Sequence, residues 1–199
     1  LRYCFLLAIL LGALGISLFL AVSMGSVQIS LSDTYRIILS QLGAPFEIGD
    51  ISKSTLAIVW NMRLPRIFLA LIVGAGLSMC GSVMQSTVNN PIAEPYVLGI
   101  SAGATFGATL SIILGFKVMI GLGSFLGAIL ATVAVLVIAS MQGRMTTSSI
   151  ILSGTVVNAL FLAFSNFIIS IGANADSVMT IKFWTMGSLA GISWAHLTL

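Results

Sequence analysis

Side chains that could do chemistry are few in this chain, and their spacing argues against catalysis. Only one histidine occurs, His196, and the two cysteines, Cys4 and Cys80, lie inside apolar runs. We find no histidine–cysteine cluster, no pair of carboxylates and no nucleophile–base spacing of the kind that active sites need. The sequence therefore predicts no catalytic residues, no bound metal and no cofactor, and a protein that is not an enzyme.

Two arginines three residues apart are the best candidates for recognising a partner. Arg63 and Arg66 stand where an apolar run begins, and residues at this spacing share one face of a helix. The planar guanidinium group matches the geometry of a carboxylate, which favours contact with an acidic protein surface. Snorkelling toward lipid headgroups explains the same pair without a protein partner.

A second candidate site is a proline-rich turn. Asn90-Pro91 and Glu94-Pro95 are two dipeptides that disfavour helix, because the residue before a proline is pushed out of the α region. They predict a tight re-entry turn between two helices. Glu94 is the only carboxylate between Asp50 and Asp176, and it either completes this turn or contacts a partner.

The elements that position these residues are membrane helices. Hydrophobic residues make up 58% of the 199 residues and charged residues only 7%, far below the roughly 25% of a soluble domain. Neither a soluble globule nor a nucleic-acid partner fits this composition. Five runs have no charge and are long enough to span a bilayer as helices: 3–32, 67–93, 95–116, 118–143 and 145–175.

The fold class is therefore all-α, a polytopic transmembrane helical bundle with five full spans plus the start of a sixth. We expect the spans at about 3–24, 64–86, 93 or 95–114, 118–141 and 147–171. The polar segment 25–60 has an amphipathic pattern near Leu31–Leu42 that predicts a short surface helix. Pro65 fits the first turn of the second span, and the sixth hydrophobic element begins at Phe183.

Small residues recur every four positions in three of the spans and predict close helix packing: Gly74/Ser78/Ser82, Gly99/Gly103/Gly107 and Gly123/Gly127/Ala131. The fifth span also carries polar residues, of which Ser153, Asn158 and Asn166 are candidates for lining a water-filled path. Hydrogen bonding between helices explains them equally well.

Several motifs in order along the chain resemble one family. They are Arg63-Leu64-Pro65-Arg66, a glycine-rich helix ending in Gly81 and Gln85, Asn90-Pro91-Ile92-Ala93-Glu94-Pro95, and Leu98-Gly99-Ile100-Ser101-Ala102-Gly103-Ala104. This pattern is similar to that of the FecCD family, permease subunits of binding-protein-dependent ABC importers for iron–siderophore complexes, haem and cobalamin. The motif at Asn90–Pro95 departs from the family only by isoleucine for leucine at position 92. The resemblance covers essentially the whole chain.

The resemblance implies a dimeric permease in the bacterial cytoplasmic (inner) membrane, as a homodimer or paired with a homologous permease. It implies a partner ATPase and an extracytoplasmic substrate-binding protein that docks on Arg63 and Arg66. Glu94 would contact the ATPase or control the gate, and Thr147 and Ser148 match the cytoplasmic gate. We expect residues 1–199 to be the N-terminal part of a single permease domain of about ten helices. The base rate of the family favours an iron–siderophore cargo.

Two other classes of protein are weighed against this one. An ion-coupled secondary transporter usually needs ionisable groups at the membrane midplane, and the five runs contain none. An intramembrane enzyme lacks its catalytic groups, as described above. The chain also has no G-x-x-x-x-G-K-[ST] phosphate-binding loop, so ATP hydrolysis would belong to a separate subunit.

Orientation is the point on which charge and resemblance disagree. The family has a cytoplasmic N-terminus, which places most basic residues outside, whereas the positive-inside rule favours the opposite orientation. The outer set would be Arg36, Lys53, Arg63, Arg66, Lys117 and Lys182, and the inner set Arg2 and Arg144. We follow the family topology.

Overall fold

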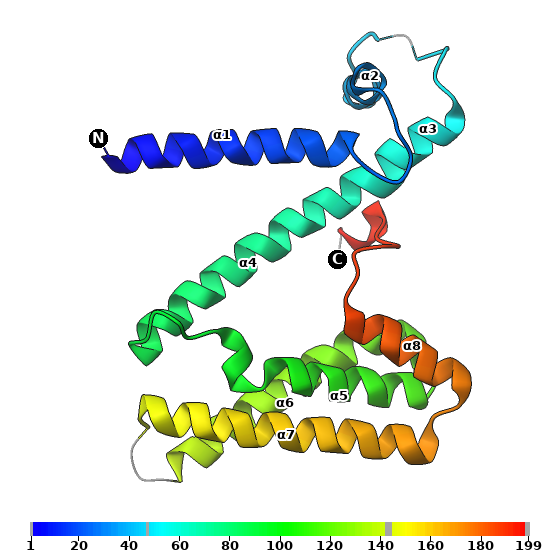
Figure 1. Cartoon of the computed structure of the whole chain (residues 1–199). Coiled ribbons are helices and arrows are strands. Elements are labelled where there is room, and N and C mark those ends of the chain that lie inside the picture. The colour runs from blue at the N-terminus through cyan, green and yellow to red at the C-terminus, as the bar shows by residue number, and fades with distance from the viewer. Residues whose placement is uncertain (1, 47, 142–144, 198–199) are drawn as a thin grey trace. The chain divides into compact units, whose positions relative to one another are not determined.

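The computed structural model describes residues 2–46, 48–141 and 145–197, and its regular elements there are all helical (Figure 1). The chain forms two compact units, Leu1–Ala75 with Leu189–Leu199 and Gly76–Ser188, which are described separately below. Arg144, which was assigned to the inner side, lies outside the described residues.

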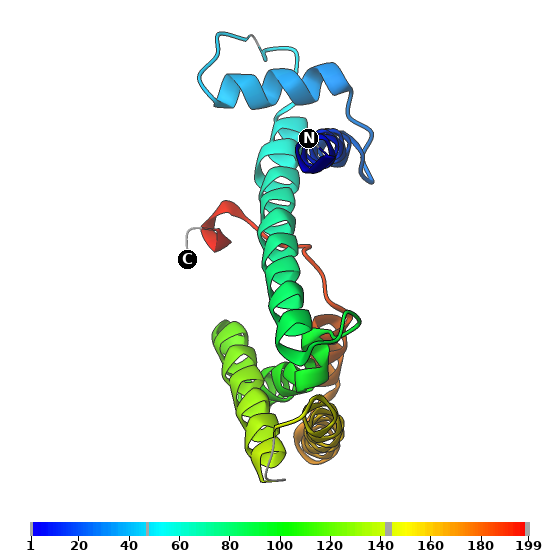
Figure 2. The same ribbon diagram turned by 90° about the vertical axis from the view of Figure 1, so that its left-hand side faces the viewer.

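The first unit contains α1 (Arg2–Ser23), α2 (Leu31–Gln41), α3 (Lys53–Ala57) and the start of α4 (Leu64–Val88). A π-helical turn, Ile58–Arg63, joins α3 to α4 without a break. Figure 2 shows α2 crossing the beginning of α3 at a steep angle. The buried side chains that hold this unit together are Val22, Ile37, Val59 and Leu64.

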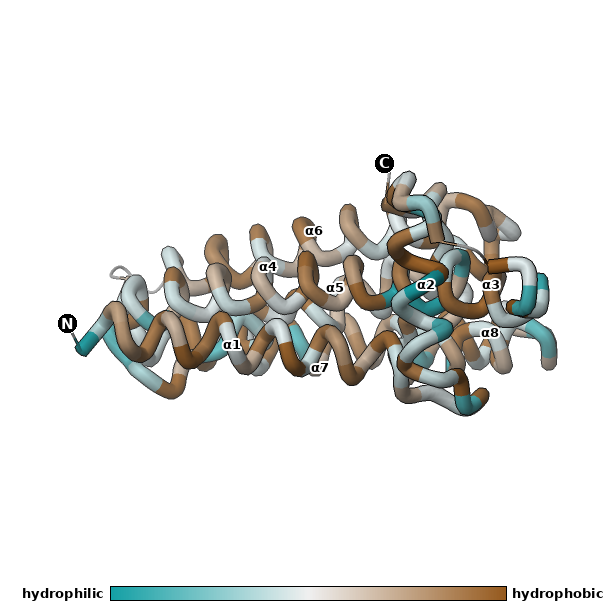
Figure 3. Tube along the Cα trace, turned by 90° about the horizontal axis from the view of Figure 1, so that it is seen from above, coloured by the Kyte–Doolittle hydropathy of each residue, from teal (hydrophilic) through white to brown (hydrophobic). Residues whose placement is uncertain are grey.

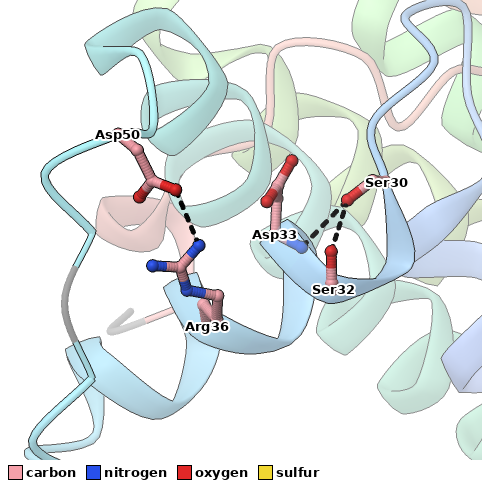
Figure 4. Close-up of polar contacts among 5 residues, drawn as sticks. All are labelled: Ser30, Ser32, Asp33, Arg36 and Asp50. Carbon is pink, nitrogen blue, oxygen red and sulfur yellow. Dashed lines mark hydrogen bonds and ion pairs between the residues drawn. The ribbon is translucent and has the colours of Figure 1, made fainter.

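The predicted short amphipathic helix is confirmed as α2, and its place on the membrane surface stays a prediction. The Ser30 hydroxyl accepts from the Asp33 N–H at 3.1 Å and caps the helix, and Ile37 is fully buried while Tyr35 is exposed. Figure 4 shows these contacts and the ion pair between Arg36 Nη1 and Asp50 Oδ2 at 2.9 Å. The hydrogen bond from Arg36 lowers the pKa of the Asp50 carboxyl below its ordinary value.

The second span begins earlier than predicted. Its helix starts at Lys53 instead of near Leu64, because the Ser52 hydroxyl caps it by accepting from the Thr55 N–H at 3.1 Å. Pro65 is therefore inside a continuous helical stretch, and its placement in a first turn was wrong. The wider π-turn before Pro65 gives the ring room that an α-turn would deny it.

The second unit holds the end of α4, a 3₁₀ turn Pro95–Leu98, α5 (Ile100–Ile113), α6 (Ile120–Ser140), α7 (Thr147–Gly172) and α8 (Ala175–Met186). The predicted glycine packing is present between α5 and α6. A Cβ added to Gly103 would lie 2.3 Å from the Gly127 carbonyl oxygen, and one added to Gly107 would lie 2.0 Å from that of Gly123. The two backbones therefore touch, as small residues allow.

Among the described residues, four helical stretches are long and apolar enough to cross a membrane: Arg2–Ser23, Lys53–Val88, Ile120–Ser140 and Thr147–Gly172. The mainly apolar colouring of α1 and the hydrophilic residues on α2 and α3 are visible in Figure 3. The third predicted span, α5, has only 14 residues and rises about 21 Å, so the count of five spans is not confirmed. That α5 is shorter than the preceding helix is confirmed.

The residues before the predicted start of the sixth element at Phe183 are mostly helical. Helix α8 covers Ala175–Met186, capped by Asn174, whose side-chain oxygen accepts from the Ser177 N–H at 2.8 Å. Asp176 in the first turn adds a favourable charge at the N-terminus. The sixth element therefore does not start at Phe183, and the chain bends instead at Gly187 and Gly191, which have φ of 71° and 86°.

Candidate docking, turn and gate residues

Arg63 makes its hydrogen bonds to the end of α1. Its Nη1 donates to the Val22 and Ser23 carbonyls at 2.7 and 2.9 Å, and its Nη2 donates to the Val27 carbonyl. The last carbonyls of a helix have no partner within the helix, so the guanidinium caps α1. Gly25 leaves room for it, since a Cβ there would lie 2.8 Å from Nη2.

Arg66 has more hydrogen-bond donors left for a partner than Arg63 has. Its Nε donates to the Leu189 carbonyl at 3.1 Å, while its two terminal nitrogens have no partner in the part of the chain that the structure describes. Arg66 is exposed, and it lines one hollow of about 440 Å³ together with Arg63, Met62 and Ala70. The shared face expected from the spacing is present, and the docking role of the two arginines stays a prediction.

The re-entry turn ends α4 as the two X-Pro dipeptides predict. Asn89 takes a left-handed conformation with φ of 51°, and the Asn90 N–H donates to the Gln85 carbonyl at 3.1 Å, which is a Schellman-type end. The Asn90 side-chain oxygen then accepts from the Ile92 N–H at 3.1 Å across Pro91. The side chain therefore shapes the turn.

Glu94 follows in an extended conformation, and Pro95 opens the 3₁₀ turn. The Glu94 carboxylate makes no capping hydrogen bond and is exposed, so it is not used to complete the helix start. The turn itself is closed by the backbone, where the Val97 N–H donates to the Glu94 carbonyl at 3.1 Å. Contact of Glu94 with an ATPase stays a prediction.

The start of α7 is tied to the end of α4. A capping box joins Thr146 and Ser149, and the Thr147 hydroxyl donates to the Val88 carbonyl at 2.8 Å. Ser148 is exposed and has no such bond. The two gate candidates therefore differ, because Thr147 is held against α4 and Ser148 is free to face a pathway.

The polar residues of α7 divide between two faces. Ser153 is 1% exposed, and its hydroxyl has no hydrogen-bond partner among the described residues. It lies on the core side with Val157 and Phe161, whereas Asn158 is half-buried and Asn166 is exposed. Positions 148, 155 and 166 are 7 and 11 residues apart, close to two and three whole turns, so they form one exposed polar row.

Three features of these regions escaped sequence reasoning. The capping of α1 by Arg63, the small residue required at Gly25 and the contacts of Trp194 all join segments at least 36 residues apart. Local patterns cannot report such pairings. The capping box at Thr146 and Ser149 is a local signal that could have been found.

Three features described above define a polytopic helical membrane protein. They are the re-entry turn that ends α4, the close glycine contacts between α5 and α6, and the apolar helices long enough to cross a membrane. The chain belongs to the FecCD transport family, whose sequence model matches residues 13–199.

Relatives support this membership. The chain is 34% identical to the uncharacterized ABC transporter permease protein YvrB of Bacillus subtilis, over 94% of this chain and 54% of that protein. It is 36% identical to the cobalamin import system permease protein BtuC of Halobacterium salinarum, over 76% of this chain and 41% of the relative. The chain thus spans about half the length of the relatives it matches.

A solved structure assigned to a metal-chelate type ABC transporter in an inward-facing conformation is also similar. The match has a TM-score of 0.68 and 29% sequence identity, and covers 93% of this chain and 54% of that one.

Proposed function

We propose that this chain is part of the membrane-spanning permease subunit of an ABC importer, which takes a metal chelate or a related complex into the cytoplasm. The observation that carries this proposal is the similarity to the inward-facing transporter over 93% of the chain, together with the family match to residues 13–199. A partner ATPase supplies the energy, and a second permease subunit completes the pathway in the bacterial inner membrane.

A substrate-binding protein docks on the arginine pair. Arg66 makes the direct contact, since its terminal nitrogens are unpaired among the described residues, and a carboxylate could accept both. Arg63 contributes charge, because its own donors are directed at the α1 carbonyls. Glu94 and its turn contact the ATPase.

The pathway follows the exposed polar row of α7. Asn158 and Asn166 offer amide groups to water or cargo, and Thr147 and Ser148 form the cytoplasmic gate at the beginning of the helix. Ser153 contributes less directly, because it is buried between helices of its own unit.

We favour an iron–siderophore complex as the cargo. The names of the relatives add other candidate cargoes. One relative is named as a ferric enterobactin permease of Escherichia coli, another as a molybdate permease of Haemophilus influenzae. Cobalamin and molybdate are therefore tested beside the iron complex.

The test is uptake into proteoliposomes that contain the full-length permease, its ATPase and its substrate-binding protein. Uptake of one of three labelled cargoes, ferric enterobactin, cobalamin or molybdate, should require ATP and the binding protein. It should persist when an ionophore collapses the ion gradients. Uptake that needs an ion gradient and no ATP would instead identify a secondary transporter.

A further inference from the structure

The turn before Pro65 leaves a backbone carbonyl without its donor. In the π-helical turn Ile58–Arg63 the Leu64 N–H donates to the Val59 carbonyl, five residues back. In the same register the next N–H along the chain would donate to the Trp60 carbonyl. That next residue is Pro65, which has no N–H, so the backbone cannot satisfy Trp60.

An indole from a distant part of the sequence supplies the missing donor. Trp194 Nε1 donates to the Trp60 carbonyl at 2.8 Å. The Trp194 ring also packs against Trp60 and Phe68, with ring centroids 5.4 and 5.8 Å apart. Both tryptophans are half-buried, so an unsatisfied carbonyl at this place would be costly.

The segment that carries Trp194, residues 189–197, is here called the strap. It is held to the beginning of α4 at a second point, where Arg66 Nε donates to the Leu189 carbonyl at 3.1 Å. Gly191, at φ of 86°, provides the bend between these two attachments. Two independent hydrogen bonds, one to Trp60 and one from Arg66, therefore hold the strap to the segment around Pro65.

We propose that Trp194 is a positioning residue, which stabilises the π-turn before Pro65 and thereby sets the directions of Arg63 and Arg66. A π-turn contains one residue more than an α-turn, and each residue advances a helix by about 100°. Relaxing the π-turn would rotate Arg63 relative to Arg66 and move it away from the end of α1. The functional half of this inference rests on the docking role proposed above.

A double-mutant cycle between Trp194→Phe and Pro65→Ala tests the idea in the full-length permease assembled with its ATPase. The phenylalanine keeps an aromatic ring but removes the N–H. The alanine restores a backbone N–H at position 65, so in the π register the helix can satisfy the Trp60 carbonyl itself. Trp184→Phe is the matched control, since no hydrogen bond of that indole is found among the described residues.

Hydrogen exchange of residues 58–68 is the first measurement. Trp194→Phe alone should speed exchange about tenfold, as expected for a lost bond to a half-buried carbonyl. In the Pro65→Ala background, Trp194→Phe should have little effect on the exchange rate. Trp184→Phe should have no effect in the wild-type or the Pro65→Ala background. Equal effects of Trp194→Phe in both backgrounds would overturn the proposal.

Docking of the substrate-binding protein from the uptake assay is the second measurement. Trp194→Phe should weaken docking several-fold and make it less sensitive to salt, because the arginines no longer face the partner together. If the exchange effects of the two changes are non-additive but Trp194→Phe docks the binding protein as well as the wild type does, the positioning role is rejected. The hydrogen bond of Trp194 would then have only a structural role. If no binding protein docks on the wild type, the proposed function fails, while the exchange cycle still decides the role of the indole.

Discussion

The Thr147 hydroxyl donates to the Val88 carbonyl at 2.8 Å and joins the first turn of α7 to the last residue of α4. Val88 belongs to the final turn, where carbonyls lack partners within the helix. The contact therefore closes the end of α4 and fixes the entry of α7 at the same point.

Replacing Thr147 by valine should loosen this junction. Valine has the same shape but no hydroxyl, so the Val88 carbonyl loses its donor at a cost of about 1 kcal/mol or more. Thr147→Ser keeps the hydroxyl and is the control. Thermal unfolding of the purified permease should show a lower midpoint for valine than for serine, and equal midpoints would show that the bond contributes nothing.

Ser148 is expected to tolerate no large side chain if it belongs to the gate. It is exposed at the beginning of α7, so Ser148→Trp should insert and fold normally but block uptake in proteoliposomes. Cysteines at this position should crosslink between the two permease subunits in one nucleotide state and not in another. Normal uptake by the tryptophan variant would remove Ser148 from the gate.

The contact between α5 and α6 should be intolerant of a single added methyl group. A Cβ at Gly127 would lie 2.2 Å from the Gly103 carbonyl oxygen, and the backbone there cannot move aside easily. Gly127→Ala should therefore destabilise the protein by about 1–3 kcal/mol, despite the better helix propensity of alanine. Gly121→Ala on the same helix meets nothing within 4 Å and should be neutral or stabilising.

The sequence predicted those parts of this structure that depend on local chemistry. The α2 helix, the break at Asn89–Pro95 and the glycine contacts follow from caps, prolines and small residues that act over a few positions. Span boundaries were less well predicted. Ser52 and Asn174 start helices in polar segments that hydropathy alone assigns to loops.

The features that the sequence did not predict are mostly contacts between residues far apart in the chain. Arg63 and Arg66 were correctly expected on one face, but their actual acceptors, Val22 and Leu189, are 41 and 123 residues away. Nothing in their spacing identifies those carbonyls. Ser153 looked like a path residue by polarity, and only packing shows that it lies on the core side of α7.

The ion pair between Arg36 and Asp50 should make the loop after α2 sensitive to acid. The arginine lowers the pKa of the Asp50 carboxyl in the folded protein, so the pair stabilises the loop at pH values above the ordinary carboxyl pKa of 3.8. This stabilisation of the loop is lost as the pH falls through the lowered pKa of Asp50. Because the pair is exposed, its effect should be confined to the loop.

A spin label on a cysteine that replaces the exposed Pro45 reports this change, once Cys4 and Cys80 have been replaced by serine. Its mobility should be low at pH 7 and rise as the pH falls below about 4. In Asp50→Asn the label should be mobile throughout, because the amide has no charge for Arg36 to bind. Asp33→Asn is the control and should show the same pH response of the label as the wild type, since Asp33 bonds to the Ser30 cap through its backbone N–H, which the change keeps. A label whose mobility changes equally in wild type and Asp50→Asn would show that another group controls the loop.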